Sequence, residues 1–211
     1  MHNPATQVKK PVAEGFTVWF TGWSGAGKTT LAIALETRLR RRGLNNVQRL
    51  DGDVVREDLT RDLGFSKEDR DENIRRITFV AELLSNNGVA TLVSFISPYR
   101  DARAKAKQRC LNFVEVYTKC SLEALARRDT KGMYARAMAG EIKNFTGISD
   151  PYEEPETPDV LVETDEETVE ESLQKVISAL EEKGLLPRES MGQKQVTSTQ
   201  VKKATNQRAG R

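Results

Sequence analysis

The chain has 211 residues, which is enough for one domain with a substantial core and short for two. Charged residues make up 30% of it, but the net charge is only +2, so no overall field marks a nucleic-acid binder. No segment approaches the roughly 20 apolar residues of a membrane span, and the N-terminus lacks the apolar core of a signal peptide. We therefore expect a cytoplasmic, single-domain protein that binds neither nucleic acid nor membrane.

Histidine and cysteine are both scarce. His2 is the only histidine, and the only cysteines, Cys110 and Cys120, form no C-x-x-C motif. Histidine acid–base catalysis and histidine zinc sites are thus effectively excluded. Proton transfer must come from carboxylates, hydroxyls, lysines or water. Two cysteines in a chain of this size fit a reducing cytosol rather than a disulfide framework.

The most informative stretch lies near the N-terminus. Residues 1–13 are polar and aperiodic, which predicts a flexible arm before a domain that begins near Glu14. The apolar run 16–21 predicts the first strand, and Gly22–Thr29 directly after it matches the P-loop pattern G-x-x-x-x-G-K-[ST]. Its glycines let backbone N–H groups approach phosphate oxygens. The predicted ATP-binding residues here are Gly22, Trp23, Ser24, Gly25, Ala26, Gly27, Lys28, Thr29 and Thr30.

Two side chains of this loop carry specific expected roles. The Lys28 ammonium is expected to bridge the β- and γ-phosphates of ATP, and the Thr29 hydroxyl is expected to ligate the Mg²⁺ that accompanies ATP. Leucines at 31, 35 and 39 then recur at helical spacing. They predict a helix over 29–42, with Gly43 as its C-terminal cap.

Further strands and helices alternate along the rest of the chain. We expect strands at 47–51, 89–96, 113–118 and 160–163 and helices at 66–86 and 99–109. Ser66 with Asp69 predicts a helix start, as does Thr164 with Glu167 for the last helix, which Gly184 and Pro187 end. Five strands alternating with helices predict a three-layer α/β P-loop fold with a mainly parallel sheet.

Polar motifs follow the second and third predicted strands. Asp51, Asp53 and Arg56 come after the second, and their carboxylates could hold Mg²⁺ through water or accept a proton. The alternative is a solvated turn, because Asp-Gly is common turn chemistry. Ser97 and Arg100 end the third strand. Ligands of such sheets gather at the carboxyl ends of the strands, so we expect all these residues to meet the P-loop.

Residues 127–134 form a basic stretch that contains a glycine. P-loop kinases place in this part of the chain a lid that closes over the nucleotide and excludes water. The alternative is a charged surface helix.

Several motifs together resemble the adenylyl-sulfate kinase (APS kinase) family over about residues 15–187. They are the P-loop, LDGD with Arg56, LGFS at 63–66, DRDENIRR at 69–76, FISPYR at 95–100, KGMY at 131–134 and IKNFTGISDPYEEP at 142–155. The resemblance implies transfer of the γ-phosphate of ATP to the 3′-hydroxyl of adenosine 5′-phosphosulfate (APS), giving PAPS and ADP in sulfate assimilation. The chain departs from the family pattern at Trp23, Val54 and Thr130, where leucine, asparagine and proline are common.

The resemblance also implies residue roles. Arg56, Arg70 and Asn73 would hold the phosphosulfate and ribose of APS, and Phe65 and Phe145 would sandwich its adenine. Arg128 and Lys131 would lie near ATP and the lid, and Asp53 would contact Mg²⁺ through water. The catalytic residues would be Lys28, Asp53 and Ser97. The full set on the APS side is Asp51, Asp53, Arg56, Phe65, Arg70, Asn73, Ile96, Ser97, Lys143 and Phe145.

Two mechanisms are compatible with these residues. In direct transfer, Asp53 orients or deprotonates the 3′-hydroxyl. In the other, Ser97 becomes a phosphoserine intermediate, which would make the chain a phosphoprotein. A serine nucleophile normally needs an adjacent base, and no histidine is placed to serve. We therefore favour direct transfer with Ser97 binding APS.

Family resemblance implies a homodimer, and a separate ATP sulfurylase to supply APS because the chain has no sulfurylase domain. The regulatory disulfide of plant relatives is not expected, since neither cysteine lies in the arm. Residues 188–211 carry six basic residues and one acidic residue, and they predict a disordered tail outside the resemblance.

Two other functions are compatible with a P-loop chain of this kind. One is another kinase of this fold, such as a nucleotide kinase that phosphorylates AMP. The other is a non-catalytic ATP-binding protein whose basic tail contacts nucleic acid; Asp53, Arg56 and Ser97 argue against it.

Overall fold

The computed structural model describes residues 14–129 and 132–188. The predicted arm, the tail beyond Arg188, Thr130 and Lys131 lie outside these ranges. The strands are β1 (Phe16–Thr21), β2 (Val47–Asp51), β3 (Ala90–Ser94), β4 (Phe113–Lys119) and β5 (Val160–Glu163). They form one sheet in the order β2-β3-β1-β4-β5, and every neighbouring pair is parallel. The predicted α/β fold is therefore confirmed.

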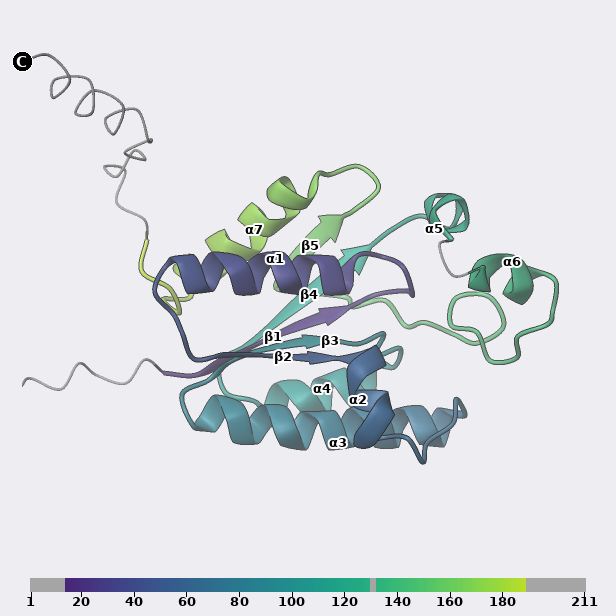
Figure 1. The fold of residues 1–211 in the computed structure, drawn as a ribbon, viewed down its shortest axis with the longest axis horizontal. Helices are drawn as coiled ribbons and strands as arrows, with labels where there is room; N and C mark the ends of the chain where they lie inside the picture. Colours follow the sequence, from purple (N-terminus) through teal and green to yellow (C-terminus); the bar gives the residue numbers. More distant parts are fainter. Residues whose placement is uncertain (1–13, 130–131, 189–211) are drawn as a thin grey trace, which may run out of the picture.

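Helices cover both faces of the sheet. In Figure 1, α1 (Lys28–Arg41) and α7 (Val169–Glu182) lie on one face, and α3 (Lys67–Asn86) and α4 (Arg100–Arg109) lie on the other. Each face has its own apolar cluster. Val18 and Phe20 of β1 join the cluster beneath α1, whereas Trp19 joins the cluster beneath α3. Because successive strand side chains point to opposite faces, β1 is buried on both.

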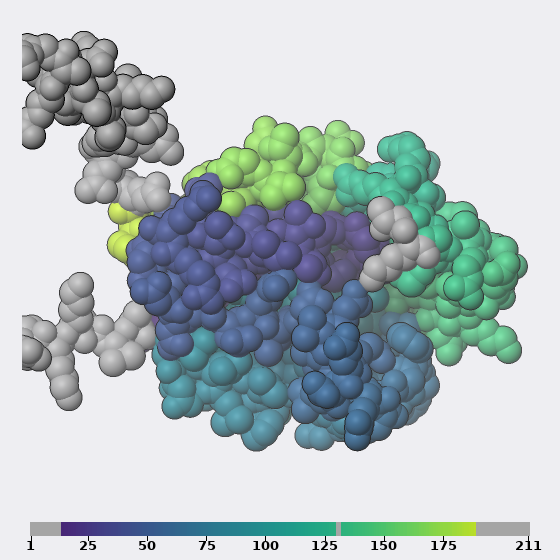
Figure 2. Space-filling model, viewed as in Figure 1, coloured from purple at the N-terminus to yellow at the C-terminus, as the bar shows by residue number. Residues whose placement is uncertain are grey.

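Three short helices were not among the elements expected from the sequence, although a charged surface helix was the alternative for residues 127–134. They are α2 (Gly52–Asp58), α5 (Leu122–Arg128) and α6 (Met133–Met138), and Figure 1 places them beyond the carboxyl ends of the strands. Helices of six or seven residues are too short to show clear periodicity. Figure 2 shows the residues between β4 and β5, in teal-green, at this end of the molecule.

The predicted start of the last helix is wrong. The N-cap of α7 is Thr168, which forms a capping box with Glu171, and not Thr164 with Glu167. Thr164 instead donates its hydroxyl to the P-loop carbonyl of Ala26 at 2.9 Å. A tertiary contact therefore moves the helix start by one turn. In contrast, the predicted cap at Ser66 is confirmed, because its hydroxyl accepts from the backbone N–H of Asp69.

Candidate active site

The P-loop takes a backbone path that requires glycine. Gly22, Gly25 and Gly27 all have positive φ angles, of 144°, 75° and 95°. A side chain at Gly22 would also place its Cβ 2.2 Å from the carbonyl oxygen of Thr118. Gly27 is the N-cap of α1, so the loop opens directly onto the N-terminus of a 14-residue helix. Free N–H groups and the helix dipole favour an anion at such a place.

Lys28 lies within this loop. Its side chain is buried, and Nζ donates to the carbonyl oxygens of Gly22 at 2.9 Å and Trp23 at 2.7 Å. Burial lowers the pKa of Lys28 to about 8, although the Asp51 and Asp53 carboxylates act to raise it. The ammonium is thus held inside the loop, in surroundings that lack enough negative charge to balance it.

This pKa predicts that ATP binding takes up a proton. The pKa of about 8 lies below the ordinary 10.5, so between these values part of the unbound protein carries neutral Lys28. The negative charge of ATP should raise this pKa, and the uptake should disappear well below pH 8. The number of protons taken up on ATP binding is measured by calorimetry at pH 9 in buffers of different ionisation enthalpy. Lys28→Arg should bind ATP without uptake, and equal uptake in that variant would rule out Lys28 as the source.

Asp51 connects the P-loop to the end of β2. One carboxylate oxygen, Oδ2, accepts from the Thr29 hydroxyl at 2.7 Å and from the Ser94 hydroxyl at 2.9 Å. The other accepts from the backbone N–H of Asp53 at 3.1 Å. Burial acts to raise the pKa of Asp51, but these hydrogen bonds outweigh it and hold the pKa below its ordinary value. The hydroxyl and the carboxylate are hard oxygen donors of the kind that Mg²⁺ prefers.

From the sequence, both Asp51 and Asp53 are expected on the acceptor side, and Asp53 is also expected to be catalytic and to contact Mg²⁺ through water. In the structure Asp51 is the carboxylate that contacts Thr29, and Asp53 lies exposed on the first turn of α2. Both carboxylates lie close enough to Lys28 to influence its pKa. The predicted meeting of the P-loop with the residues after β2 is therefore confirmed.

Four predicted acceptor residues gather around the start of α3. The Arg56 guanidinium lies over the Phe65 ring, 4.5 Å from its centroid, and the Phe65 side chain is 58% exposed. Arg70 is buried and donates to the Phe65 carbonyl at 3.0 Å and to the Thr146 hydroxyl at 2.7 Å. Asn73 is also buried, and its Oδ1 has no hydrogen-bond partner among the described residues. A buried acceptor of this kind is suited to a ligand.

The segment 142–152 lies next to these acceptor residues, since Arg70 donates to Thr146 within it. Phe145 is buried, with its ring edge against Tyr134 at a centroid distance of 5.0 Å, and Lys143 is exposed. A hollow of about 440 Å³ is lined by residues 147–152 of this segment and by Trp23.

Arg128 was predicted on the ATP side. It donates to the Thr164 carbonyl at 2.6 Å, and because the Thr164 hydroxyl donates to Ala26, Arg128 lies next to the P-loop. Lys131 lies outside the described residues.

Ser97 lies in a buried, tightly held turn. Its exposed fraction is 1%, its φ is 47°, and its hydroxyl accepts from the indole N–H of Trp19 at 3.0 Å. The Ile96 carbonyl accepts from the Thr21 hydroxyl at 2.7 Å and from the Gly22 N–H at 3.4 Å. These bonds bring the motif that follows β3 to the P-loop, as expected. Sequence reasoning missed Trp19 and Thr21, because both read as ordinary core residues of a strand.

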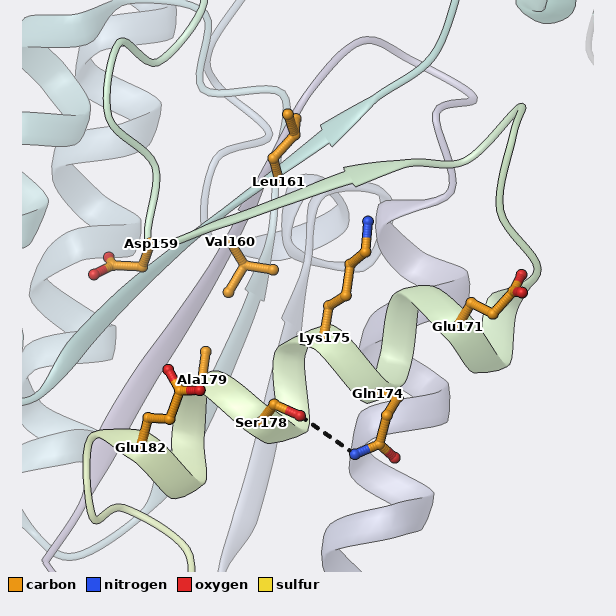
Figure 3. Close-up of a pocket in the computed structure, with 9 residues that line it drawn as sticks. All are labelled: Asp159, Val160, Leu161, Glu171, Gln174, Lys175, Ser178, Ala179 and Glu182. Carbon is orange, nitrogen blue, oxygen red and sulfur yellow. Dashed lines mark hydrogen bonds between the residues drawn. The ribbon is translucent and has the colours of Figure 1, made fainter.

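A second hollow is lined by a different set of residues. It has a volume of about 550 Å³ and runs between β5 and α7, with Lys175, Ser178 and Glu182 among its lining residues (Figure 3). None of the predicted site residues lines it. The candidate active site is therefore the edge where the P-loop, Asp51 and Ser97 meet.

The fold and this site define a P-loop kinase. The model of the family described as adenylylsulphate kinase matches residues 14–163. An adenylyl-sulfate kinase of Halothermothrix orenii is 62% identical over 173 residues, which cover 82% of this chain and 93% of the relative. A probable adenylyl-sulfate kinase of Pseudomonas aeruginosa is 61% identical over 163 residues, which cover 77% of this chain and 76% of the relative. The chain belongs to the adenylylsulphate kinase family.

A solved structure supports the same assignment. The Mycobacterium tuberculosis APS kinase CysC, in complex with AMPPNP and APS, superposes with a TM-score of 0.75 at 45% identity, covering 80% of this chain and 98% of that one. The chain is thus a phosphotransferase with an alcohol acceptor. None of the helices in residues 14–129 and 132–188 is long and apolar enough to cross a membrane.

Proposed function

We propose that this chain transfers the γ-phosphate of ATP directly to the 3′-hydroxyl of APS, with PAPS and ADP as products. The observation that carries the proposal is the convergence of the P-loop, Asp51 and the Arg56, Phe65 and Arg70 group at one edge of the sheet. The 3′-oxygen would form a bond to the γ-phosphorus as the bond to the β-phosphate oxygen breaks. The hydroxyl proton would pass to Asp53.

The ATP side is supported by the P-loop and its neighbours. Loop N–H groups, the Lys28 ammonium and Arg128 would offset the charge of the phosphates. Lys131 is proposed here from the sequence alone. The oxygens of Thr29 and Asp51 would hold Mg²⁺, with Asp53 beside them through water. When bound, Mg²⁺ neutralises charge that develops on the phosphate oxygens.

The acceptor side is supported by charge and by the exposed ring of Phe65. The guanidinium forks of Arg56 and Arg70 suit the several oxygens of a phosphosulfate. Asn73 offers the buried amide oxygen described above. Phe65 and Phe145 would stack on the adenine, with Lys143 and the backbone of Ile96 and Ser97 completing the pocket.

We predict that Arg56→Ala and Arg70→Ala weaken APS use more than ATP binding, since both residues lie on the acceptor side. kcat/KM for APS should fall about tenfold or more, the scale of a lost charge-assisted hydrogen bond, while ATP affinity stays within a few-fold. Arg75→Ala is the matched control, because Arg75 lies on α3 and pairs at the surface with Glu72. Equal loss of ATP binding, measured calorimetrically without APS, would contradict this placement.

Ser97→Ala should keep measurable turnover. The Ser97 hydroxyl is buried and already accepts from Trp19, so it is poorly placed to attack ATP. Steady-state rates of the variant at saturating ATP and APS provide the measurement. Turnover indistinguishable from background, in a variant with wild-type thermal stability, would favour the phosphoserine route.

The acceptor is tested by comparing APS with AMP. We expect ADP formation with APS to far exceed ADP formation with AMP in a coupled assay with Mg²⁺ and ATP. Phosphorylation of AMP with no reaction of APS would assign the chain to nucleotide kinases instead. No turnover with either acceptor would favour a non-catalytic ATP-binding protein.

The remaining context rests on family resemblance and composition. We infer a homodimer that receives APS from a separate ATP sulfurylase. A cytoplasmic location is consistent with the two cysteines, which are both free and buried. The proposed domain covers residues 14–187, between the N-terminal arm and the basic tail.

A further inference from the structure

Arg103 is a buried arginine that joins four segments of the chain around the site. Arg103 of α4 is 3% exposed, and its Nε donates to the Glu115 carboxylate of β4 at 2.9 Å. Its two other nitrogens donate to backbone carbonyls, Nη1 to Ser97 at 2.6 Å and Nη2 to Glu153 at 2.6 Å. A single side chain thus connects α4, β4, the turn after β3 and the segment that contains Glu153.

The turn at Ser97 needs such support. Its φ of 47° is uncommon for a residue other than glycine, and a backbone of this kind persists only where its surroundings hold it. The Ser97 carbonyl accepts from Arg103 and, at 3.4 Å, from the Thr21 hydroxyl. Thr21 is the last residue of β1, directly before the P-loop. The turn is therefore tied both to Arg103 and to the base of the phosphate-binding loop.

Residues 150–156, here called the acceptor strap, cross this turn. The Glu153 N–H donates to the Pro98 carbonyl at 2.8 Å, and the Tyr152 hydroxyl lies 2.9 Å from that of Thr21. The Arg103 guanidinium also lies over the Tyr152 ring, 5.8 Å from its centroid. The strap is thus fixed to the Ser97 turn at several adjacent points, with Arg103 beneath it.

The acceptor strap leads from Arg103 to the predicted APS-binding residues. Its first residue, Asp150, lies 3.6 Å from Nε of Arg70 and accepts from the Tyr99 hydroxyl at 3.2 Å. The backbone N–H of Asp150 donates to the Phe145 carbonyl at 3.1 Å. A shift of the strap would therefore move both Arg70 and the loop that carries Phe145.

We propose that Arg103 is a positioning residue for the phosphoryl acceptor. It holds the Ser97 turn and the acceptor strap in register with the P-loop, so that the acceptor hydroxyl lies in line with the γ-phosphate. This inference rests on the proposed function. Arg103 bonds three separate oxygens with a planar fork, which the single ammonium of lysine cannot reproduce.

The kinetic test uses two variants and a control. Arg103→Lys keeps the charge beside Glu115, whereas the double variant Arg103→Met with Glu115→Met removes both charges and leaves neither buried alone. Arg109→Lys is the control, because Arg109 lies on the same helix and pairs with Glu82 at the surface. A misplacement of about 1 Å can cost about 100-fold in rate. We expect kcat/KM for APS to fall on this scale in both variants while ATP affinity stays within a few-fold.

A structural readout separates positioning from general loss of stability. The chain has two tryptophans, so the indole N–H resonance of Trp19 can be assigned in a ¹⁵N–¹H spectrum by comparison with Trp23→Phe. Both Arg103 variants should shift this resonance, since Trp19 donates to Ser97. Arg109→Lys should leave it unchanged.

The proposal is overturned if Arg103→Lys keeps wild-type kcat/KM for APS and an unshifted Trp19 resonance. Equal losses of ATP and APS binding would also overturn it, because Arg103 would then support the whole site. If the wild-type protein phosphorylates a different acceptor, the proposed function fails. In that case the Trp19 resonance alone decides whether Arg103 holds the Ser97 turn.

Discussion

Lys28→Ala should lose at least about 100-fold in kcat, the scale on which a preorganised charge stabilises a transition state. In the proposed function the ammonium would offset negative charge on the transferred phosphoryl group and on the leaving β-phosphate. The fold should survive the change, because burial of this charge lowers its pKa and so disfavours the charged form in the unbound protein. Steady-state kinetics together with thermal unfolding check both statements.

Lys119→Ala is a matched control for this variant. Lys119 ends β4 and forms a surface ion pair with Glu163 at 3.0 Å. It should keep wild-type kcat and nearly wild-type stability, since exposed ion pairs contribute little. Near-full activity of Lys28→Ala would show that the P-loop assignment is wrong.

Asp53→Asn should lose at least about 100-fold in kcat, which is the scale of general-base assistance. The substitution keeps the size of the side chain and leaves the backbone N–H that donates to Asp51, so α2 should keep its N-cap. ATP affinity should change little, because the Asp51 contact with Thr29 does not involve the Asp53 side chain. The measurement is kcat at saturating APS, with ATP binding measured separately.

Glu57→Gln is the control on the same helix, since Glu57 is exposed and lies outside the proposed site. It should behave as wild type. A kcat for Asp53→Asn within a few-fold of wild type would assign proton transfer to water or to another group. Loss of ATP binding in this variant would instead show that the Asp53 carboxylate is essential for holding Mg²⁺ and ATP.

Local sequence signals predicted much of the fold. The bounds of β1, β2 and β5 agree with the expected ranges, because the apolar residues of each strand lie between clear turn signals. The P-loop was identified because its glycines, lysine and threonine lie within eight consecutive residues. The predicted gathering of motifs at the carboxyl edge follows from the parallel direction of the strands, because their carboxyl ends lie at the same edge of the sheet.

Long-range contacts account for what the sequence did not predict. Thr164 reads as a helix cap, but its hydroxyl donates to Ala26, 138 residues earlier. Asp51 and Asp53 lie two residues apart in the sequence, and the fold distinguishes them, because Asp51 accepts from Thr29 and Ser94 whereas Asp53 is exposed. Arg103 reads as a solvated residue in a charged helix, although it is buried against Glu115. In each case the partner is set by the tertiary fold.

The proposed function requires that phosphate passes directly from ATP to the acceptor. It is tested most directly by incubating the protein with γ-labelled ATP and Mg²⁺, first without APS and then with it. We predict that the protein stays unlabelled without APS and that all label appears at the 3′-position of PAPS once APS is added. Stoichiometric label on Ser97 that passes into PAPS at the turnover rate would contradict direct transfer.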